Sequence, residues 1–307
     1  MNNKVLVIAG PTATGKTALS VGLSKELNGE VISADSIQIY KKLNIGSAKP
    51  NEREKQGIVH HLMDFLEPDA TYSVADYVKD AKEKIDEIFA RNKVPIIAGG
   101  TGLYISSLVD NVEFSDVDAD TSVRERLYKE LEELGIEAMH ERLEKIDPES
   151  ACAIHPNNTK RVIRALEIYE TTGKTKKELE KGSKLRTSPY DFCLIGLNCD
   201  RELLYERINK RVDMMIEQGL FSEVEELLSG GVSKDAQSMQ GIGYKEVVMA
   251  QNGEITEDEC IELIKKNSRN YAKRQLTWFR RSDYKWFDCL DKDLYKKVRK
   301  HIGEFGI

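Results

Sequence analysis

The stretch from Gly10 to Thr17 constrains this chain most, because it fits the phosphate-loop pattern G-x-x-x-x-G-K-[ST] at every fixed position. The stretch consists of Gly10, Pro11, Thr12, Ala13, Thr14, Gly15, Lys16 and Thr17. Glycines let the backbone curl so that N–H groups face phosphate oxygens, Lys16 adds a positive charge, and the Thr17 hydroxyl can hold Mg²⁺. A chance match in an ordinary turn is the alternative, but an apolar strand predicted before the loop and a helix predicted after it favour phosphate binding.

Strands and helices alternate through the first part of the chain, which predicts a parallel sheet with helices on both faces. The expected strands cover residues 4–9, 30–33, 94–98, 192–197 and 284–287, the last at an edge. The expected helices cover residues 17–27, 74–91 with Ser73 as cap, 103 onward, 123–146, 157–170, 201–218 and 257–281, with another at the C-terminus.

The alternation stops near Asp110, because residues 113–190 contain no convincing strand. We therefore predict an α/β fold with a P-loop-type parallel sheet flanked by helices, and an all-helical insertion domain. The catalytic core is expected to comprise residues 1–112 and 191–307, and the insertion residues 113–190.

Composition limits the class of protein. The chain is 40% hydrophobic and 32% charged, which is ordinary for a globular protein, and no apolar run is long enough to span a membrane. Its five cysteines show no C-x-x-C spacing, which indicates reduced thiols without a zinc site. The first strand begins near Met1, leaving no room for a signal peptide, so we expect a cytoplasmic protein. A net charge of −6 argues against indiscriminate nucleic-acid binding but allows local basic surfaces.

Asp35 lies just past the carboxyl end of a predicted strand, where open α/β sheets place their ligand-binding groups. Its carboxylate could accept a proton or hold Mg²⁺. The alternative is an Asp that caps a turn together with Ser33 and Ser36. Proximity to the phosphate loop, expected on the neighbouring strand, favours a functional role.

Thr101 lies in the glycine-rich turn after the strand at 94–98. Its hydroxyl could orient Asp35 or a substrate atom, or Thr101 could simply cap the following helix, and spacing alone leaves both open. The same strand ends without the acidic residue that nucleoside-triphosphatases use to organise Mg²⁺. The loop is therefore expected to hold phosphates without hydrolysing a nucleotide.

Two regions are rich in basic residues. The segment from Lys265 to Arg281 contains no acidic residue, and Tyr271, Trp278 and Phe279 lie among its cations. Lys266, Arg269, Lys273 and Arg280 share a helical face, which suits contact with a nucleic-acid backbone; a solvated face with inward aromatics is the alternative. The second region comprises Lys160, Arg161, Arg164, Lys174, Lys176, Lys177, Lys181, Lys184 and Arg186, and is diluted by Glu178 and Glu180.

Arg207 and Arg211 are spaced i, i+4 on the helix expected at 201–218, opposite its apolar stripe. One of them could reach the phosphate site, although a surface position is the default for both. The pair His60-His61 has no partner at a recognisable spacing and is interpreted as structural.

The chain resembles the tRNA dimethylallyltransferase (isopentenyl-tRNA transferase) family over nearly its whole length. The phosphate loop alone is widely shared, but its order with Ala34-Asp35-Ser36 and Gly99-Gly100-Thr101-Gly102 is far more specific. Further family-like stretches are Asn158 to Glu167, Gln240 to Glu246 and Lys273 to Arg280. Some eukaryotic relatives carry a C-terminal zinc finger, which this chain lacks, so it looks like the compact bacterial form.

The resemblance implies transfer of a dimethylallyl group from dimethylallyl diphosphate to N6 of the adenine 3′ to the anticodon. The phosphate loop, with Mg²⁺ on Thr17 and a cation assigned to Arg211, would hold the departing diphosphate. Asp35 would accept the N6 proton, and Thr101 would hydrogen-bond near the amine. The anticodon stem-loop of tRNA is the implied partner, and no obligate protein partner is indicated. The implied tRNA contacts are Asp35, Ser36, Ile37, Gln38, Thr101, Arg124, Thr159, Lys160, Arg161, Arg164, Lys273, Arg274 and Arg280.

Two other functions remain open from the sequence. A small-molecule kinase of the nucleotide-kinase type would consume ATP, with Asp35 contacting the acceptor and the insertion acting as a lid. A nucleotide-gated RNA-binding protein would show nucleotide-dependent RNA affinity and no covalent product.

Overall fold

The computed structural model describes residues 3–112, 121–175, 177–179 and 187–307. The chain divides into two compact units. The core unit comprises residues 1–109 and 189–307, and the helical unit comprises residues 110–188. Of the predicted basic residues, Lys176, Lys181, Lys184 and Arg186 lie outside the described residues.

The core unit is built on a six-stranded sheet in the order β3-β2-β4-β1-β5-β6, and every neighbouring pair runs parallel. The strands are β1 (Lys4–Ala9), β2 (Gly29–Ala34), β3 (His60–His61), β4 (Val94–Gly99), β5 (Asp191–Asn198) and β6 (Lys285–Asp288). The predicted α/β fold is confirmed, and β6 is the expected edge strand.

The sheet order corrects one expectation. Asp35 follows β2, which was expected beside β1, but β4 lies between these two strands. A parallel pair needs a crossover connection, so strands consecutive in sequence need not be neighbours in the sheet. The turn that carries Thr101 therefore emerges between Asp35 and the P-loop.

β3 was not expected as a strand, because two residues are too short to show an alternating pattern. It pairs with Val31 and Ile32 of β2. His61 directs Nε2 to the carboxylate of Glu30 at 2.6 Å, which agrees with a structural interpretation of the histidines.

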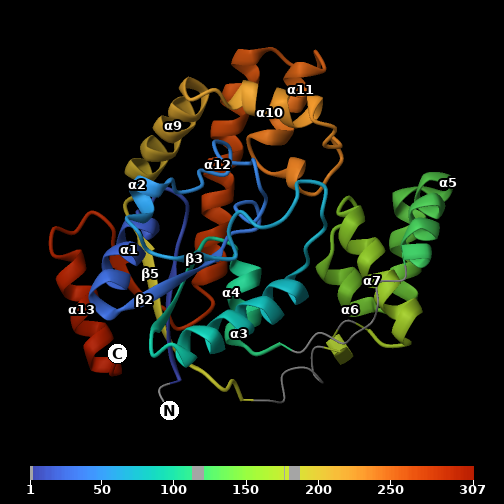
Figure 1. Cartoon of the computed structure of the whole chain (residues 1–307). Helices are drawn as coiled ribbons and strands as arrows, with labels where there is room; N and C mark the ends of the chain where they lie inside the picture. Colours follow the sequence, from blue (N-terminus) through green and yellow to red (C-terminus); the bar gives the residue numbers. More distant parts are fainter. Residues whose placement is uncertain (1–2, 113–120, 176, 180–186) are drawn as a thin grey trace. The chain divides into compact units, whose positions relative to one another are not determined.

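Side chains alternate along β1, so the sheet has an apolar core on each face. Val5, Val7 and Ala9 belong to one core and Leu6 and Ile8 to the other. The second core is covered by α1 (Lys16–Leu27) and α13 (Leu294–Phe305), as Figure 1 shows at the left of the sheet.

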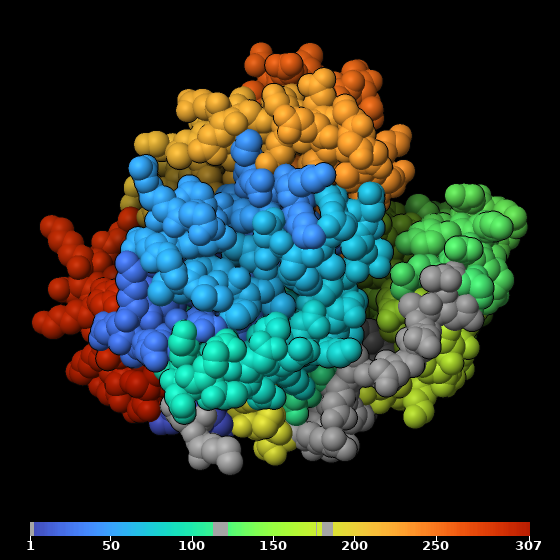
Figure 2. All heavy atoms as spheres, viewed as in Figure 1, coloured from blue at the N-terminus to red at the C-terminus, as the bar shows by residue number. Residues whose placement is uncertain are grey.

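Helices α3 (Val74–Ala90), α4 (Gly102–Val109) and α12 (Glu257–Phe279) contribute to the first core. The remaining helices of the core unit are α2 (Glu52–Lys55), α9 (Arg201–Glu217), α10 (Leu220–Ser229), the 3₁₀ turn η1 (Ser238–Gln240) and α11 (Tyr244–Gln251). Ser73 caps α3 as predicted, with its hydroxyl accepting from the Asp76 N–H. In Figure 2 the light-blue segment near residues 40–65 forms a continuous surface with gold residues of α9 and α10.

The described part of the helical unit contains α5 (Thr121–Ile146), α6 (Pro148–Ala153) and α7 (Thr159–Thr172). Residues 123–146 were expected as one helix, but Gly135 has φ 84° and ψ 172°, which interrupts α5. Such a conformation is accessible to glycine because it has no Cβ. The unit has its own apolar core, formed by Leu127, Met139, Leu143, Ala151, Val162, Ile163, Ala165 and Leu166. None of the described helices combines the length and the apolar composition that a membrane span requires.

Candidate active site

The predicted site begins where three strands end at the same level. Ala9 of β1 and Ala34 of β2 are both in register with Gly99 of β4. The P-loop, the Asp35 turn and the Thr101 turn therefore leave the sheet side by side. This is the carboxyl edge at which open α/β sheets bind their ligands.

The P-loop curls as its sequence predicts. Gly15 has a φ of 81°, and Ala13 also takes a left-handed conformation at φ 65°. The Thr14 hydroxyl donates to the carbonyl of Pro11 at 2.8 Å, which closes the loop from inside. Because Gly15 precedes α1 and has no side chain to cap it, the first N–H groups of that helix remain available to an anion.

Lys16 lies within this curl, where Nζ donates to the carbonyl of Pro11 at 2.7 Å. Burial and the nearby Arg211 guanidinium lower the pKa of Lys16 to about 7, while Asp35 and Cys289 oppose the shift. A bound anion would reverse the shift, because an opposite charge favours the ammonium form. The loop thus holds a lysine whose ammonium form would be stabilised by a negative ligand.

Arg211 on α9 reaches the same loop. Its Nη1 donates to the Thr12 hydroxyl at 3.3 Å and its Nη2 to the Ala48 carbonyl at 3.4 Å. Burial lowers the pKa of Arg211, and the Asp35 carboxylate opposes this. Arg207 instead lies toward Cys289, with 3.7 Å between Nη1 and Sγ. Of the two predicted candidates, the structure brings Arg211 to the P-loop.

Asp35 caps a turn, as the alternative interpretation expected, but it uses only one of its two carboxylate oxygens to do so. Its Oδ1 accepts from the N–H groups of Ile37 at 2.9 Å and Gln38 at 3.2 Å. Within the described residues no hydrogen bond is found for Oδ2. One oxygen therefore fixes the turn, and the other is available to a ligand. The side-chain amide of Gln38 donates to the carbonyls of Ser47 and Ala48.

Thr101 is held against the Asp35 turn. Its hydroxyl accepts from the Ser36 N–H at 3.1 Å and lies 3.4 Å from the Ser36 hydroxyl. Its own N–H donates to the Ala34 carbonyl, and its carbonyl accepts from Tyr104 and Ile105 at the start of α4. The Thr101 hydroxyl thus contacts the residue after Asp35 rather than Asp35 itself.

Sequence reasoning missed two residues of α12 that face this edge. The Tyr271 hydroxyl lies within hydrogen-bonding reach of the Thr101 and Gln275 side chains, and burial and the Asp35 charge raise the pKa of Tyr271 to about 12. Gln275 is buried and bonds to the P-loop and to the Gly100 turn. The i, i+4 spacing of these two polar residues in the acid-free part of α12 was the available signal.

The cations of α12 divide into two groups. Lys266, Lys273, Arg274 and Arg280 are exposed. Arg269 was expected on the same nucleic-acid face, but its Nη1 donates to Asn209 of α9 at 2.6 Å, and Lys265 pairs with Asp213 at 2.9 Å. These two cations therefore help to join α12 to α9.

The aromatic residues of α12 agree in part with the alternative interpretation, in which they pack inward beneath a solvated cationic face. Phe279 is fully buried, and Trp278 packs so closely on Gly102 that a Cβ there would lie 2.5 Å from its ring. Arg274 lies over the Tyr271 ring at 5.7 Å, and Arg281 over the Trp278 ring at 5.8 Å. The rings thus pack inward while neighbouring guanidinium groups cover their outer sides.

In the helical unit, two predicted cations have an internal partner. Arg124 and Arg164 both pair with the buried carboxylate of Glu167, at 3.0 and 2.9 Å. Lys160 and Arg161 are exposed at the start of α7, directly after Thr159. The two guanidinium groups thus share one carboxylate, and the three side chains together keep one net positive charge.

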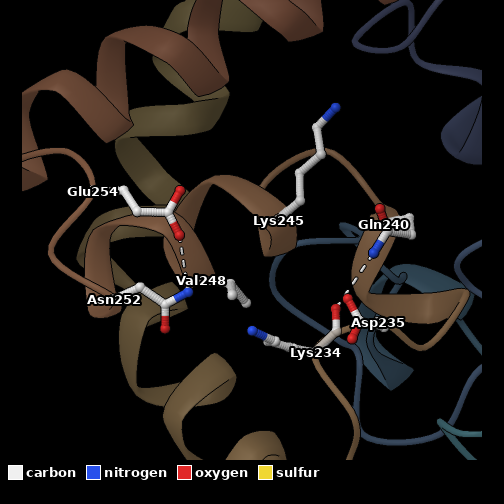
Figure 3. A pocket seen from close by; sticks show the side chains of 7 residues that line it. All are labelled: Lys234, Asp235, Gln240, Lys245, Val248, Asn252 and Glu254. Carbon is white, nitrogen blue, oxygen red and sulfur yellow. Dashed lines mark hydrogen bonds between the residues drawn. The ribbon is translucent and has the colours of Figure 1, made fainter. Parts of the chain in front are cut away.

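Two cavities accompany these features. A small one of about 30 Å³ adjoins the P-loop and is lined by Thr17, Ser20, Val31, Ser33, Gln38, Pro50, His60, Met63 and Ala98. A larger one of about 200 Å³ lies at α11, where the Lys234 side chain points toward Val248 and Asn252 while Lys245 extends away from them (Figure 3). This larger cavity shares no lining residue with the P-loop. The larger of the two cavities is therefore not the one at the candidate active site.

Two bacterial relatives match nearly the whole chain. A tRNA dimethylallyltransferase of Acetivibrio thermocellus is 48% identical over 99% of both chains. One of Caldanaerobacter subterraneus subsp. tengcongensis is 50% identical over 98% of this chain and 97% of the relative.

Two solved structures of proteins with related names have a similar fold. The full-length tRNA isopentenylpyrophosphate transferase from Bacillus halodurans has a TM-score of 0.73 at 44% identity, covering 99% of this chain and 98% of its own. A eukaryotic dimethylallyltransferase acting on tRNA has a TM-score of 0.79 at 32% identity, covering 97% of this chain and 78% of its own. The sequence model described as IPP transferase matches residues 38–282, a range that includes Thr101, Arg211 and Gln275. The chain therefore belongs to the IPP transferase family.

Proposed function

We propose that this chain transfers a dimethylallyl group from dimethylallyl diphosphate to N6 of the adenine 3′-adjacent to the anticodon in tRNA, releasing diphosphate. The observation that carries the proposal is the common register of Ala9, Ala34 and Gly99. The loop proposed to bind the diphosphate and the Asp35 carboxylate proposed as base therefore leave the same edge of the sheet, with the Thr101 turn between them. This arrangement, in a chain of this family, supports the proposal. The reaction on tRNA would take place in the cytoplasm.

The P-loop, Gly10 to Thr17, would bind the diphosphate. The N–H groups at the start of α1, together with Lys16 and Arg211, face the place where its oxygens would lie. As the C–O bond breaks, negative charge grows on the leaving diphosphate, and fixed donors that stabilise this charge lower the barrier. Bond cleavage occurs at carbon, so the acidic residue that triphosphatases use is not required.

Mg²⁺ is the proposed metal, held by the Thr17 hydroxyl together with diphosphate oxygens and water. The exposed side chain of Thr17 and its cavity with Ser20, Ser33 and Gln38 fit such an ion, because Mg²⁺ prefers oxygen ligands and retains water. Among the described residues, no group of three His, Cys, Asp or Glu is placed to hold a metal by itself. When bound, the ion would supply positive charge to the leaving diphosphate.

Asp35 would act as the base. As the new C–N bond forms, N6 loses a proton, and the Oδ2 atom of Asp35 can accept it while Oδ1 keeps the turn in place. Thr101 would hydrogen-bond near the amine. Its hydroxyl is already oriented by the Ser36 N–H, which limits the directions in which it can donate.

The adenine must leave its stack to reach this edge, so the protein must bind RNA around it. The proposed contacts in the core unit are Asp35, Ser36, Ile37, Gln38, Thr101, Lys273, Arg274 and Arg280, and those in the helical unit are Arg124, Thr159, Lys160, Arg161 and Arg164. Residues 113–190 are thus proposed to contact tRNA. Arg124 and Arg164 would do so while retaining their pairing with Glu167.

Mass spectrometry of nucleosides tests the proposal. Unmodified tRNA is incubated with the protein, Mg²⁺ and dimethylallyl diphosphate, then digested. We expect an adenosine heavier by one dimethylallyl group. Unchanged adenosine with folded protein and suitable tRNA would reject the transferase, and ATP consumption with candidate acceptors would then test the kinase alternative.

A further inference from the structure

Gln275 connects the P-loop with the Thr101 turn, the two halves of the proposed site. The sequence motifs of these two loops do not include it. Its side chain is 5% exposed, at the inner side of α12. Its Oε1 accepts from the Thr12 N–H of the P-loop at 3.0 Å. Its Nε2 donates to the Gly100 carbonyl, next to Thr101, at 2.9 Å. One side-chain amide thus joins two loops that leave different strands.

The fit around this amide is close. A Cβ added at Gly100 would lie 2.2 Å from Nε2 of Gln275, so glycine is what admits the amide at this place. Tyr271, one helical turn earlier, has its hydroxyl within reach of both Gln275 and Thr101. Hydrogen bonds to Thr12 and to Gly100 fix both ends of the amide, which has little freedom to move.

Each loop carries a different part of the proposed reaction. Thr12, besides donating its N–H to Gln275, accepts Arg211 on its hydroxyl, and so belongs to the half that would hold the diphosphate. Gly100 directly precedes Thr101, whose hydroxyl contacts the Asp35 turn, and so belongs to the half that would hold the amine. Gln275 thus joins the loop proposed to hold the leaving group to the turn proposed to hold the nucleophile.

We propose that Gln275 is a positioning residue that fixes the separation between the P-loop and the Thr101 turn. It thereby sets the approach of the adenine amine to the allylic carbon; this inference rests on the proposed function. The rate of a transfer between two bound substrates depends steeply on their alignment, and a misplacement of about 1 Å can cost on the order of 100-fold. The side-chain amide provides an acceptor for an N–H and a donor for a carbonyl on one planar group, a pair that neither a carboxylate nor an aliphatic side chain supplies.

Two substitutions separate these requirements. Gln275→Glu nearly keeps the shape but loses the donor to Gly100, and Gln275→Leu loses both bonds. Gln237→Leu is the matched control, because the Gln237 amide also bonds twice to backbone. It accepts from the Tyr72 N–H at 3.2 Å and donates to the Tyr72 carbonyl at 2.9 Å, with no contact to the P-loop or the Thr101 turn.

The experiment measures single-turnover transfer with both substrates saturating, together with separate dissociation constants for dimethylallyl diphosphate and tRNA. For both Gln275 variants we expect the transfer rate to fall on the order of 10- to 100-fold. For the uncharged Gln275→Leu we expect both dissociation constants to change less than about threefold, whereas the carboxylate of Gln275→Glu, next to the P-loop, should also weaken diphosphate binding. Gln237→Leu should lower the melting temperature and keep the transfer rate. A Gln275→Leu rate equal to that of the unmodified protein would overturn the inference, as would a loss found wholly in binding.

Gly100→Ala tests the same contact from the other loop, in case the Gln275 variants fail to fold. Its added methyl should displace the amide and reduce transfer at saturation, and the same change should cost far less beside Gln275→Ala, which leaves room for it. Equal costs in both backgrounds would overturn the inference. If the unmodified protein prenylates no tRNA, the proposed function itself fails; an active protein with unaffected variants rejects the positioning role alone.

Discussion

The guanidinium of Arg211 on α9 contacts the hydroxyl of Thr12 in the P-loop, with 3.3 Å between Nη1 and Oγ1. The P-loop near the N-terminus thus receives a cation from a helix residue 199 positions later in the sequence. Arg211→Lys should slow transfer on the order of 100-fold, because one ammonium group cannot replace both guanidinium contacts. Steady-state kinetics would measure this, with Arg207→Lys as control. Equal losses in the two variants would remove Arg211 from the site.

Lys16 makes diphosphate binding depend on pH. Its pKa of about 7 in the ligand-free protein means that the ammonium form is lost as pH rises above 7. A bound anion raises this pKa, so binding takes up a proton and affinity falls with rising pH. Calorimetry with diphosphate between pH 6 and 9 would measure the trend relative to Lys16→Arg, which stays charged and controls for titration of the ligand. Parallel curves for the two proteins would contradict the prediction.

Asp35→Asn should abolish transfer and leave tRNA affinity nearly intact. Asparagine keeps an oxygen for the Ile37 and Gln38 N–H groups, so the turn survives while the base is lost. Asp35→Ala should also abolish transfer, but removes the turn contacts as well. Filter binding of tRNA alongside the nucleoside assay would separate the two effects. Full activity of the Asn variant would refute the role of Asp35 as base.

Tyr244 and Glu223 hold the loop at residues 44–48, whose Ala48 carbonyl accepts from Arg211. The Glu223 carboxylate accepts from the N–H groups of that loop and from the Tyr244 hydroxyl, which itself accepts from the Ser47 N–H at 3.1 Å. Tyr244→Phe should lower the free energy of unfolding by about 1–3 kcal/mol, because buried polar groups lose their partner.

Urea unfolding would measure this loss. Tyr295→Phe is the control, because the exposed Tyr295 hydroxyl bonds to Glu26 at the surface, and a change within about 0.5 kcal/mol is expected there. We also expect Tyr244→Phe to raise the KM for dimethylallyl diphosphate through the displaced Ala48 carbonyl. Stabilities that fall equally in both variants would contradict the role of Tyr244 and Glu223 in holding residues 44–48.

Glu30 should make the protein sensitive to acid. Burial raises the pKa of Glu30, but hydrogen bonds from Lys93, Arg91 and His61 outweigh it and lower the pKa to about 2. The unfolded chain binds its proton nearer pH 4.5, so the stabilisation is complete above that pH and is lost as pH falls toward 2. Unfolding free energies measured across this window should lose part of their slope in Glu30→Gln. An unchanged slope would show that other carboxylates dominate.

The sequence by itself determined the long strands that lead into the three loops of the candidate site, and the chemical groups that these loops carry. Strands, helix caps and the phosphate loop depend on local patterns of residues. Apolar runs predicted every long strand, and a fixed glycine–lysine spacing predicted the P-loop. The periodic pattern predicted one continuous helix at residues 123–146, but Gly135 interrupts it. Periodicity shows where apolar residues lie and does not show where the backbone changes direction.

Only the tertiary structure decided which groups meet. It inserted β4 between β1 and β2, chose Arg211 over Arg207, and assigned Arg269 to Asn209 instead of to an exposed face. It also brought Gln275 to Thr12 across 263 positions of sequence. Local patterns record which face of an element is apolar. The partners of a buried polar side chain depend on how strands are ordered and helices packed, which no short stretch of sequence encodes.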